Sequence, residues 1–125
     1  MWSPIELPDL LDSIRSAEAE MEPDVLRLWE MIRVEPARWQ QHPMGALGGG
    51  FWVVGLLGRQ VIWYNDIEHG FNISRYTTFG TIDEYWCNQD ELHHAMYSLR
   101  RQLDTGEVSG GFGPPEPLSG GTSDV

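Results

Sequence analysis

The sequence has no lysine, and its eight basic residues are all arginine, against 19 aspartate and glutamate residues. The formal net charge is therefore -11. Because a protein needs a basic surface to neutralise phosphates, this balance excludes a general nucleic-acid binder. It also argues against docking on anionic membranes, which attract basic segments. The charge instead favours a basic protein as the partner, since opposite charges steer association.

Cysteine and long apolar runs are also scarce. Cys87 is the single cysteine, so an internal disulfide is excluded. The longest apolar run, Phe51–Leu57, has seven residues, whereas a membrane-spanning helix needs about 20. The first residues lack the basic and apolar regions of a signal peptide. We therefore expect a cytoplasmic protein.

The length and the glycine distribution predict one domain followed by a tail. A chain of 125 residues is typical of a single domain. Residues 104–125 contain six glycines and three prolines and follow neither a helical nor a strand period. We expect residues 104–125 to form a flexible tail and residues 1–103 to form the folded domain.

Three stretches have apolar residues at helical spacing, and each predicts a helix. They run from Leu10 to Met21, from Pro23 to Ile32 and from Leu92 to Leu103. Proline stands near the start of the first two, where a helix tolerates it. For the third, Asn88 is a candidate N-cap and Gly106 a stop signal.

Four stretches rich in β-branched and aromatic residues predict strands, at residues 51–57, 60–65, 71–77 and 81–86. Residues 33–50 contain two prolines and several glycines, and we interpret them as an irregular connector. The expected order is α-α-β-β-β-β-α. This order predicts an α+β fold, with an antiparallel sheet of about four strands and helices packed on it.

The first two strands are separated by Gly58 and Arg59, the pattern of a type II′ hairpin turn. In a regular register both faces of this hairpin are apolar. One face has Val53, Gly55, Leu57, Ile62 and Tyr64, and the other has Trp52, Val54, Leu56, Val61 and Trp63. Because antiparallel sheets normally leave one face to water, two alternatives follow: helices cover both faces, or one face meets a partner.

The densest polar cluster is the segment from Asn65 to Asn72. Its side chains Asp66, Glu68 and His69 are candidate metal ligands or an acid–base pair. The spacing does not fit an EF-hand loop. The structural interpretation, which we prefer, is a strand connection in which Asn65 or Asp66 bonds the backbone and Gly70 supplies a positive φ.

Other residues carry weaker chemical patterns. His93 and His94 are adjacent, so on a helix they point about 100° apart and do not share a metal easily. Cys87 stands near a predicted helix start, which can lower the pKa of a thiol, but we interpret it as a partly buried structural residue. The glycines at 48–50 precede a strand rather than a helix, so they are not interpreted as a phosphate loop.

Several blocks resemble small bacterial proteins of unassigned function. The blocks are residues 49–55, 61–72, 80–85 and 89–92. In size, charge and layout the chain also resembles the acidic α+β immunity proteins that neutralise bacterial toxins. The resemblance implies a bacterial origin and an inhibitor of a basic partner, and it assigns no role to any residue. The absence of lysine is typical of a GC-rich bacterial genome.

Together these observations predict a non-enzymatic protein-binding module with a basic protein partner and no cofactor. The expected recognition residues are Asn65, Asp66, Glu68 and His69, with Trp52 and Trp63. We expect Trp63 to be mainly structural, because an open patch around it would be unusually large for a monomer. Two alternatives remain. One is a small metal- or ligand-dependent enzyme that uses Asp66, Glu68 and His69, and the other is a homodimer or larger homo-oligomer formed through the apolar sheet face.

Overall fold

The computed structural model describes residues 4–41 and 49–106. It contains three helices and one antiparallel sheet with the strand order β1-β2-β3-β4, so the predicted α+β fold and the order α-α-β-β-β-β-α are confirmed. The elements are α1 (Leu7–Ala19), α2 (Pro23–Ile32), β1 (Arg33–Trp39), β2 (Phe51–Leu57), β3 (Gln60–Asn65), β4 (Gly70–Arg75) and α3 (Leu92–Thr105). Among the described residues, no helix is long and apolar enough to cross a bilayer.

The helices follow the predicted apolar stripes. Proline stands in the first turn of both α1 and α2, as expected. Gly106 ends α3 with φ 77, a left-handed conformation that glycine adopts without strain. The helix therefore includes residues 104 and 105, although the sequence predicts them to belong to the tail. The rest of the predicted tail lies outside the described residues.

Two predictions about the strands are wrong: one strand lies in the segment predicted as a connector, and one predicted strand does not form. Residues 33–39 form β1 at the edge of the sheet, although Pro36 suggested a connector. An edge strand tolerates proline because its outer N–H groups need no ladder partner. Residues 81–86 form no strand beyond one isolated bridge between Gln40 and Thr81. There, the Ser74 hydroxyl donates to the Glu84 carbonyl at 2.8 Å, so a side chain bonds the backbone that a strand would have paired.

The predicted hairpin register is correct only near the turn. Gly58 has φ 59, and Leu57, Leu56 and Gly55 pair with the expected residues of β3. A β-bulge then shifts the register, so that Val53 faces Trp63 and Trp52 faces Tyr64. The extra residue reverses the alternation of side chains. Trp52 and Trp63 therefore lie on opposite faces of the sheet, contrary to the expectation that they share one.

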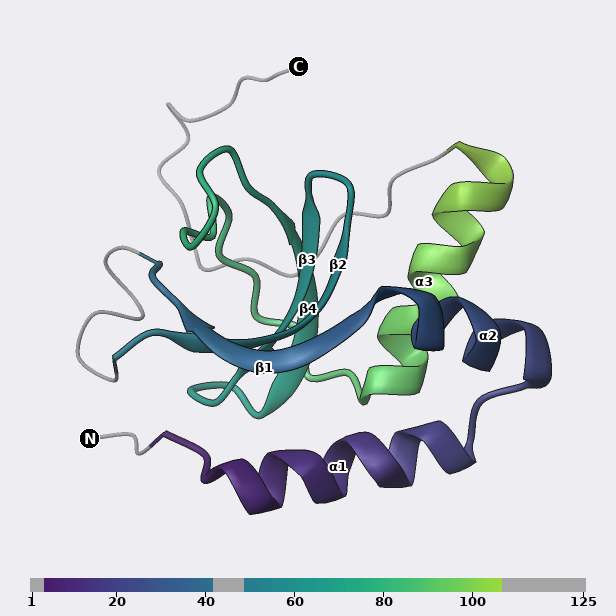
Figure 1. Ribbon diagram of the computed structural model, residues 1–125, viewed down its shortest axis with the longest axis horizontal. Coiled ribbons are helices and arrows are strands. Elements are labelled where there is room, and N and C mark those ends of the chain that lie inside the picture. The colour runs from purple at the N-terminus through teal and green to yellow at the C-terminus, as the bar shows by residue number, and fades with distance from the viewer. Residues whose placement is uncertain (1–3, 42–48, 107–125) are drawn as a thin grey trace.

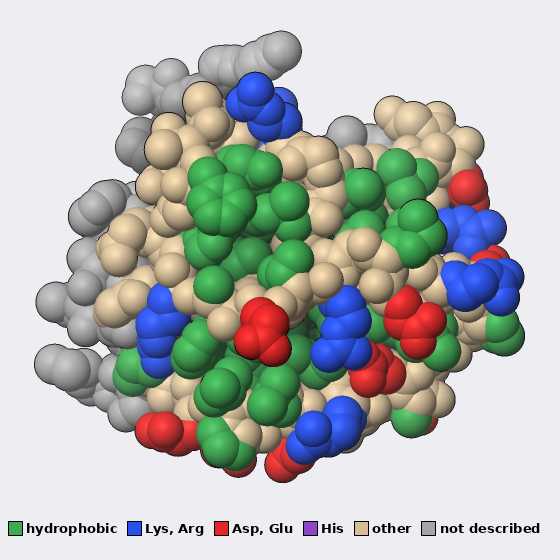
Figure 2. Space-filling view, in the orientation of Figure 1, with side chains coloured by type: hydrophobic (Ala, Val, Ile, Leu, Met, Phe, Trp, Pro, Cys, Tyr) green, Lys and Arg blue, Asp and Glu red, His purple; other side chains and the backbone are tan. Residues whose placement is uncertain are grey.

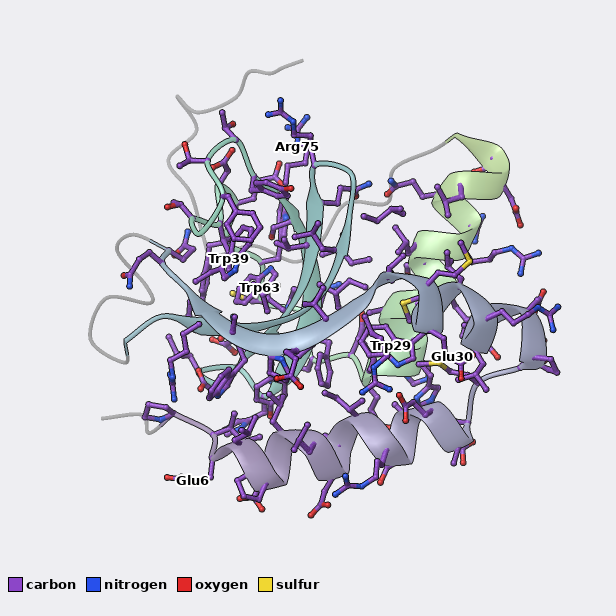
Figure 3. All side chains as sticks on the ribbon, in the orientation of Figure 1. Glu6, Trp29, Glu30, Trp39, Trp63 and Arg75 are labelled. Carbon is purple, nitrogen blue, oxygen red and sulfur yellow. The ribbon has the colours of Figure 1, made fainter. Side chains whose placement is uncertain are left out.

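Each face of the sheet has its own hydrophobic core. The helices cover one face, where Trp29 of α2 is 1 % exposed and packs among residues such as Val54 and Ile62. On the other face, Trp63 is 0 % exposed and lies beneath Ile82 and Tyr85. Figure 1 shows the helices together on one side of the curved sheet, and Figure 3 places Trp63 and Trp29 in the two separate cores. The second face is thus covered not by the helices but by the chain that follows β4.

Candidate functional site

The turn between β3 and β4 is held by Asn65, which is 0 % exposed. Its Oδ1 accepts hydrogen bonds from the N–H groups of Ile67 at 3.0 Å and Glu68 at 3.2 Å. Its Nδ2 donates to the carbonyl of Trp86 at 2.9 Å. These are the side-chain hydrogen bonds to the backbone that the structural interpretation of this segment predicts. Asn65 is therefore not available to a partner, contrary to expectation.

The positive φ of this turn belongs to His69, at 61°, and not to Gly70 as predicted. Gly70 is needed for a different reason. A Cβ at position 70 would lie closer than 3.0 Å to backbone atoms of Asn88 and Gln89. The glycine thus allows the segment before α3 to pass directly against the start of β4.

Asp66 is buried, with 2 % of its surface exposed, and it anchors the chain that precedes α1. Its Oδ2 accepts the N–H of Ile5 at 2.9 Å, and the indole N–H of Trp52 donates to the carbonyl of Ile5 at 3.2 Å. Its other oxygen has no hydrogen-bond partner among the described residues. The prediction that Asp66 is an exposed carboxylate for a basic partner is wrong, because both Asp66 and Trp52 hold the N-terminal segment.

Burial raises the pKa of the Asp66 carboxyl group above its usual value of 3.8. The folded protein then binds this proton more tightly than the unfolded chain does. Stability therefore falls as pH rises from the unfolded pKa through the raised folded pKa, and the loss is complete above the latter. The Asp66→Asn variant lacks this titrating group and does not lose stability through it. We therefore expect the difference in free energy of unfolding, variant minus native protein, to increase over that pH interval.

Denaturant unfolding at a series of pH values checks this expectation. The matched control is Glu35→Gln, which changes an exposed carboxylate on β1 and leaves Asp66 intact. A difference between Asp66→Asn and the native protein that stays constant with pH would contradict the burial argument.

The other candidate side chains of the turn lie in different surroundings. Glu68 is half-buried and interacts electrostatically with Tyr85 and Cys87. Burial raises the pKa of Tyr85 to about 12 and also raises the pKa of the Cys87 thiol, so Cys87 is not an activated nucleophile. His69 is exposed. In the described ranges, no three His, Cys, Asp or Glu side chains are grouped to hold a metal ion.

Trp63 belongs to the core rather than to a recognition surface. Its indole N–H donates to the Ser74 hydroxyl at 2.9 Å, and its ring lies 4.8 Å from that of Phe51. The face that the homo-oligomer alternative required is covered by the chain itself. Figure 2 shows hydrophobic side chains gathered at the upper left, where Figure 3 places Trp39. There, Phe79 is 74 % exposed and contacts Trp39, with 4.7 Å between ring centres.

His69 does line a groove, which we call the acidic groove. It has a volume of about 400 Å³ and lies between α1, the β3–β4 turn and the start of α3. Its lining residues are Asp12, Ser13, Ser16, Tyr64, His69, Phe71, Asp90, Glu91 and Leu92. The three carboxylates come from two segments that are distant in the sequence. Sequence reasoning found only His69, because nothing local indicates that Asp12 lies near residues 90 and 91.

Tyr64 adds a polar group to the lining of the acidic groove. The residue is only 9 % exposed, and its ring meets Phe71 edge-on at 4.9 Å. Within the part of the chain that the structure describes, its hydroxyl makes no hydrogen bond. Burial and the nearby Asp66 carboxyl group raise the pKa of Tyr64, so the hydroxyl stays protonated. The groove thus combines negative charge with an uncommitted hydroxyl.

The carboxylates that line the acidic groove are not neutralised within it. Asp12 contacts Arg15 at 2.6 Å, but both side chains are more than half exposed, so water screens this pair. The Asp90 carboxylate accepts a hydrogen bond from the neutral amide of Asn88 at 3.2 Å. Glu91 lies 3.8 Å from His93 Nδ1, beyond hydrogen-bond distance. A cation that enters the groove therefore meets carboxylates able to bind it.

Comparison with protein-family models, with characterised proteins and with solved structures finds no match to this chain. The resemblance to immunity proteins therefore stays a prediction.

Proposed function

We propose that the protein is a non-enzymatic binding module whose partner is a basic protein. The observation that carries the proposal is the acidic groove, which Asp12, Asp90 and Glu91 line together with Tyr64, whose hydroxyl has no hydrogen-bond partner among the described residues. A lysine or arginine side chain of the partner fits this chemistry, because it supplies positive charge to the carboxylates and N–H donors to the hydroxyl oxygen. The recognition site moves from Asp66 and Glu68 to this groove.

The overall charge supports the same kind of partner. A net charge of -11 attracts a basic protein over a distance and raises its association rate at low salt. The groove then provides short-range specificity. One concrete form is an immunity-type inhibitor that binds a basic toxin in a bacterial cytoplasm.

A small cationic probe tests the groove directly. We expect N-acetyl-arginine methylamide to shift the backbone NMR signals of Ser13, Ser16 and Glu91 in a saturable way. The double substitution Asp12→Asn with Glu91→Gln should weaken this binding about fivefold, since each exposed charge contributes about 0.2–1 kcal/mol. Tyr64→Phe should weaken it as well, because it removes a hydroxyl acceptor from the lining of the groove.

The matched control neutralises two other exposed carboxylates, with Glu30→Gln and Glu35→Gln. These lie on α2 and β1 and do not line the groove. The control has the same net charge as the groove variant, so any general electrostatic effect is shared. Equal weakening by both double variants would reject the groove as the site.

A further inference from the structure

The edge strand β4 has one residue, Ile73, whose outward backbone groups are unpaired. On one side of it, the N–H of Phe71 donates outward to the carbonyl of Asp90 at 2.8 Å. On the other side, the carbonyl of Arg75 accepts the N–H of Asp83 at 3.0 Å. Because outward groups recur every second residue, the N–H and C=O of Ile73 also point outward. Among the described residues, neither of them is hydrogen-bonded.

A groove lies beside this part of β4. Between the two contacts the chain that follows β4 leaves the strand edge, and the carbonyl of Trp86 accepts a hydrogen bond from Asn65 Nδ2 at 2.9 Å. Helix α3 packs against β4. The groove is lined by all three segments and has a volume of about 540 Å³, within the range of small-ligand sites, and we call it the β4 groove. Ile73 is one of its lining residues, so a ligand in the groove can reach the unpaired groups.

The geometry of β4 determines how a peptide would pair with Ile73. In an antiparallel pair, one residue of each strand exchanges both N–H···O=C bonds, so a single ligand residue satisfies Ile73. A parallel peptide would need groups from two of its residues, and a longer strand would displace Asp83 and Asp90 from the neighbouring positions. The occupant that fits is therefore one residue, antiparallel to β4, with the peptide bending away on either side.

The charges of the β4 groove favour an uncharged ligand. The ionised side chains in its described lining are two of each sign, Arg59, Arg75, Glu84 and Asp90. The carboxyl side of an antiparallel ligand points toward the Asp90 end of β4, and its amino side points toward Arg59, whose carbonyl accepts the Tyr76 N–H at 2.9 Å. A free carboxylate would thus approach a carboxylate, and a free ammonium group would approach a guanidinium. A residue within a chain, which has a neutral amide on each side, meets neither repulsion.

Helix α3 determines which side chain of the ligand would fit. Cross-strand partners share a face of the sheet, and Ile73 packs against the core that the helices cover, so the ligand's side chain would lie on the α3 side. There, Ala95, Ser98 and Gln102 line the groove from one side of the helix. Among the described residues, neither the Ser98 hydroxyl nor the Gln102 carboxamide makes a hydrogen bond. This wall is polar and uncharged.

We propose that the β4 groove binds one glutamine or asparagine residue within a peptide segment of a partner protein. The N–H of that residue would donate to the carbonyl of Ile73, and its C=O would accept the N–H of Ile73. Its side-chain carboxamide would bond to Ser98 and Gln102, because an amide supplies both donors and an acceptor. The site goes beyond the acidic groove, which prefers a cation.

Binding in the two grooves can be separated. Ile73 and Gln102 line the β4 groove and not the acidic groove. The double variant Asp12→Asn with Glu91→Gln should therefore weaken the cationic probe and leave binding in the β4 groove unchanged. Failure of one site and failure of the other are thus separately visible.

The test is an NMR titration that follows the amide proton of Ile73. The methylamides of acetyl-glutamine and acetyl-asparagine have the proposed chemistry, and acetyl-leucine methylamide lacks the carboxamide. We expect a saturable downfield shift of the Ile73 signal with at least one carboxamide probe, since this N–H gains a hydrogen bond. The leucine probe should bind about fivefold more weakly. Methylation of the probe nitrogen that donates to the Ile73 carbonyl should weaken binding by about the same factor.

Two double variants complete the test. Ser98→Ala with Gln102→Ala should weaken the better carboxamide probe about fivefold and leave the leucine probe unchanged. Ser16→Ala with Gln40→Ala is the matched control, because these exposed residues do not line the β4 groove. Alanine favours helices, so α3 should be preserved, and signal dispersion verifies this.

Three results would overturn the proposal. The first is a shift of the Ile73 signal that does not saturate. The second is equal binding of the leucine and carboxamide probes, or equal weakening by the two double variants. The third is tighter binding of free acetyl-glutamine than of its methylamide, because the carboxylates of Glu84 and Asp90 should repel the acid.

Discussion

Replacing Trp63 with alanine is expected to lower the free energy of unfolding by about 3–5 kcal/mol. The side chain is 0 % exposed and contacts Phe51 and Tyr85 in the core on the second face of the sheet. The change removes this packing and leaves a cavity beneath the chain that follows β4. It also removes the hydrogen bond to the Ser74 hydroxyl, which holds Glu84 in place. Denaturant unfolding followed by circular dichroism measures the effect.

Two further variants separate the contributions at Trp63. Trp63→Phe keeps most of the ring but loses the N–H, so it should cost less than the alanine variant. Phe79→Ala is the matched aromatic control, because Phe79 is 74 % exposed and its loss should change stability by about 0.5 kcal/mol or less. A Trp63→Ala protein within about 1 kcal/mol of the native one would contradict its place in the core and revive its role in partner binding.

Replacing Gly70 with alanine is expected to cost about 3 kcal/mol, at the upper end for overpacking. The direction is informative, because Gly→Ala at an ordinary φ otherwise stabilises a protein by about 0.4–1 kcal/mol. Gly70 is outside the left-handed region, so the backbone itself accepts alanine. The obstacle is the backbone of Asn88 and Gln89, which cannot move without breaking the bonds to Asn72.

Gly55→Ala is the matched control for Gly70→Ala, since both glycines stand in strands without a positive φ. Its added Cβ would lie 3.1 Å from a ring carbon of Trp29 and 3.2 Å from the Cδ1 of Ile62. Because these are side-chain atoms that can shift slightly, the cost should be about 1 kcal/mol, at the lower end for overpacking. Equal stability of the two variants, measured by thermal unfolding, would show that the close approach at residue 70 is not rigid.

The helices and the hairpin turn are determined locally, and the sequence predicted them. The apolar stripe of α3 and Gly106 lie within a few residues of the structure that they specify. The same holds for Gly58 and Arg59, which form the expected turn between β2 and β3. Such patterns act over one or two turns of chain, so no distant residue is needed to interpret them.

Strand identity, register and site composition depend on distant residues, and only the tertiary structure decided them. Residues 33–39 become a strand because β2 pairs with them. The bulge between Val53 and Gly55 places Trp52 and Trp63 on opposite faces of the sheet. Asp66 is buried because Ile5, 61 residues away, donates to it. The acidic groove likewise joins Asp12 to residues 90 and 91. Local propensity carries no information on such pairings, because burial and charge neighbours are fixed only when the sheet and helices pack.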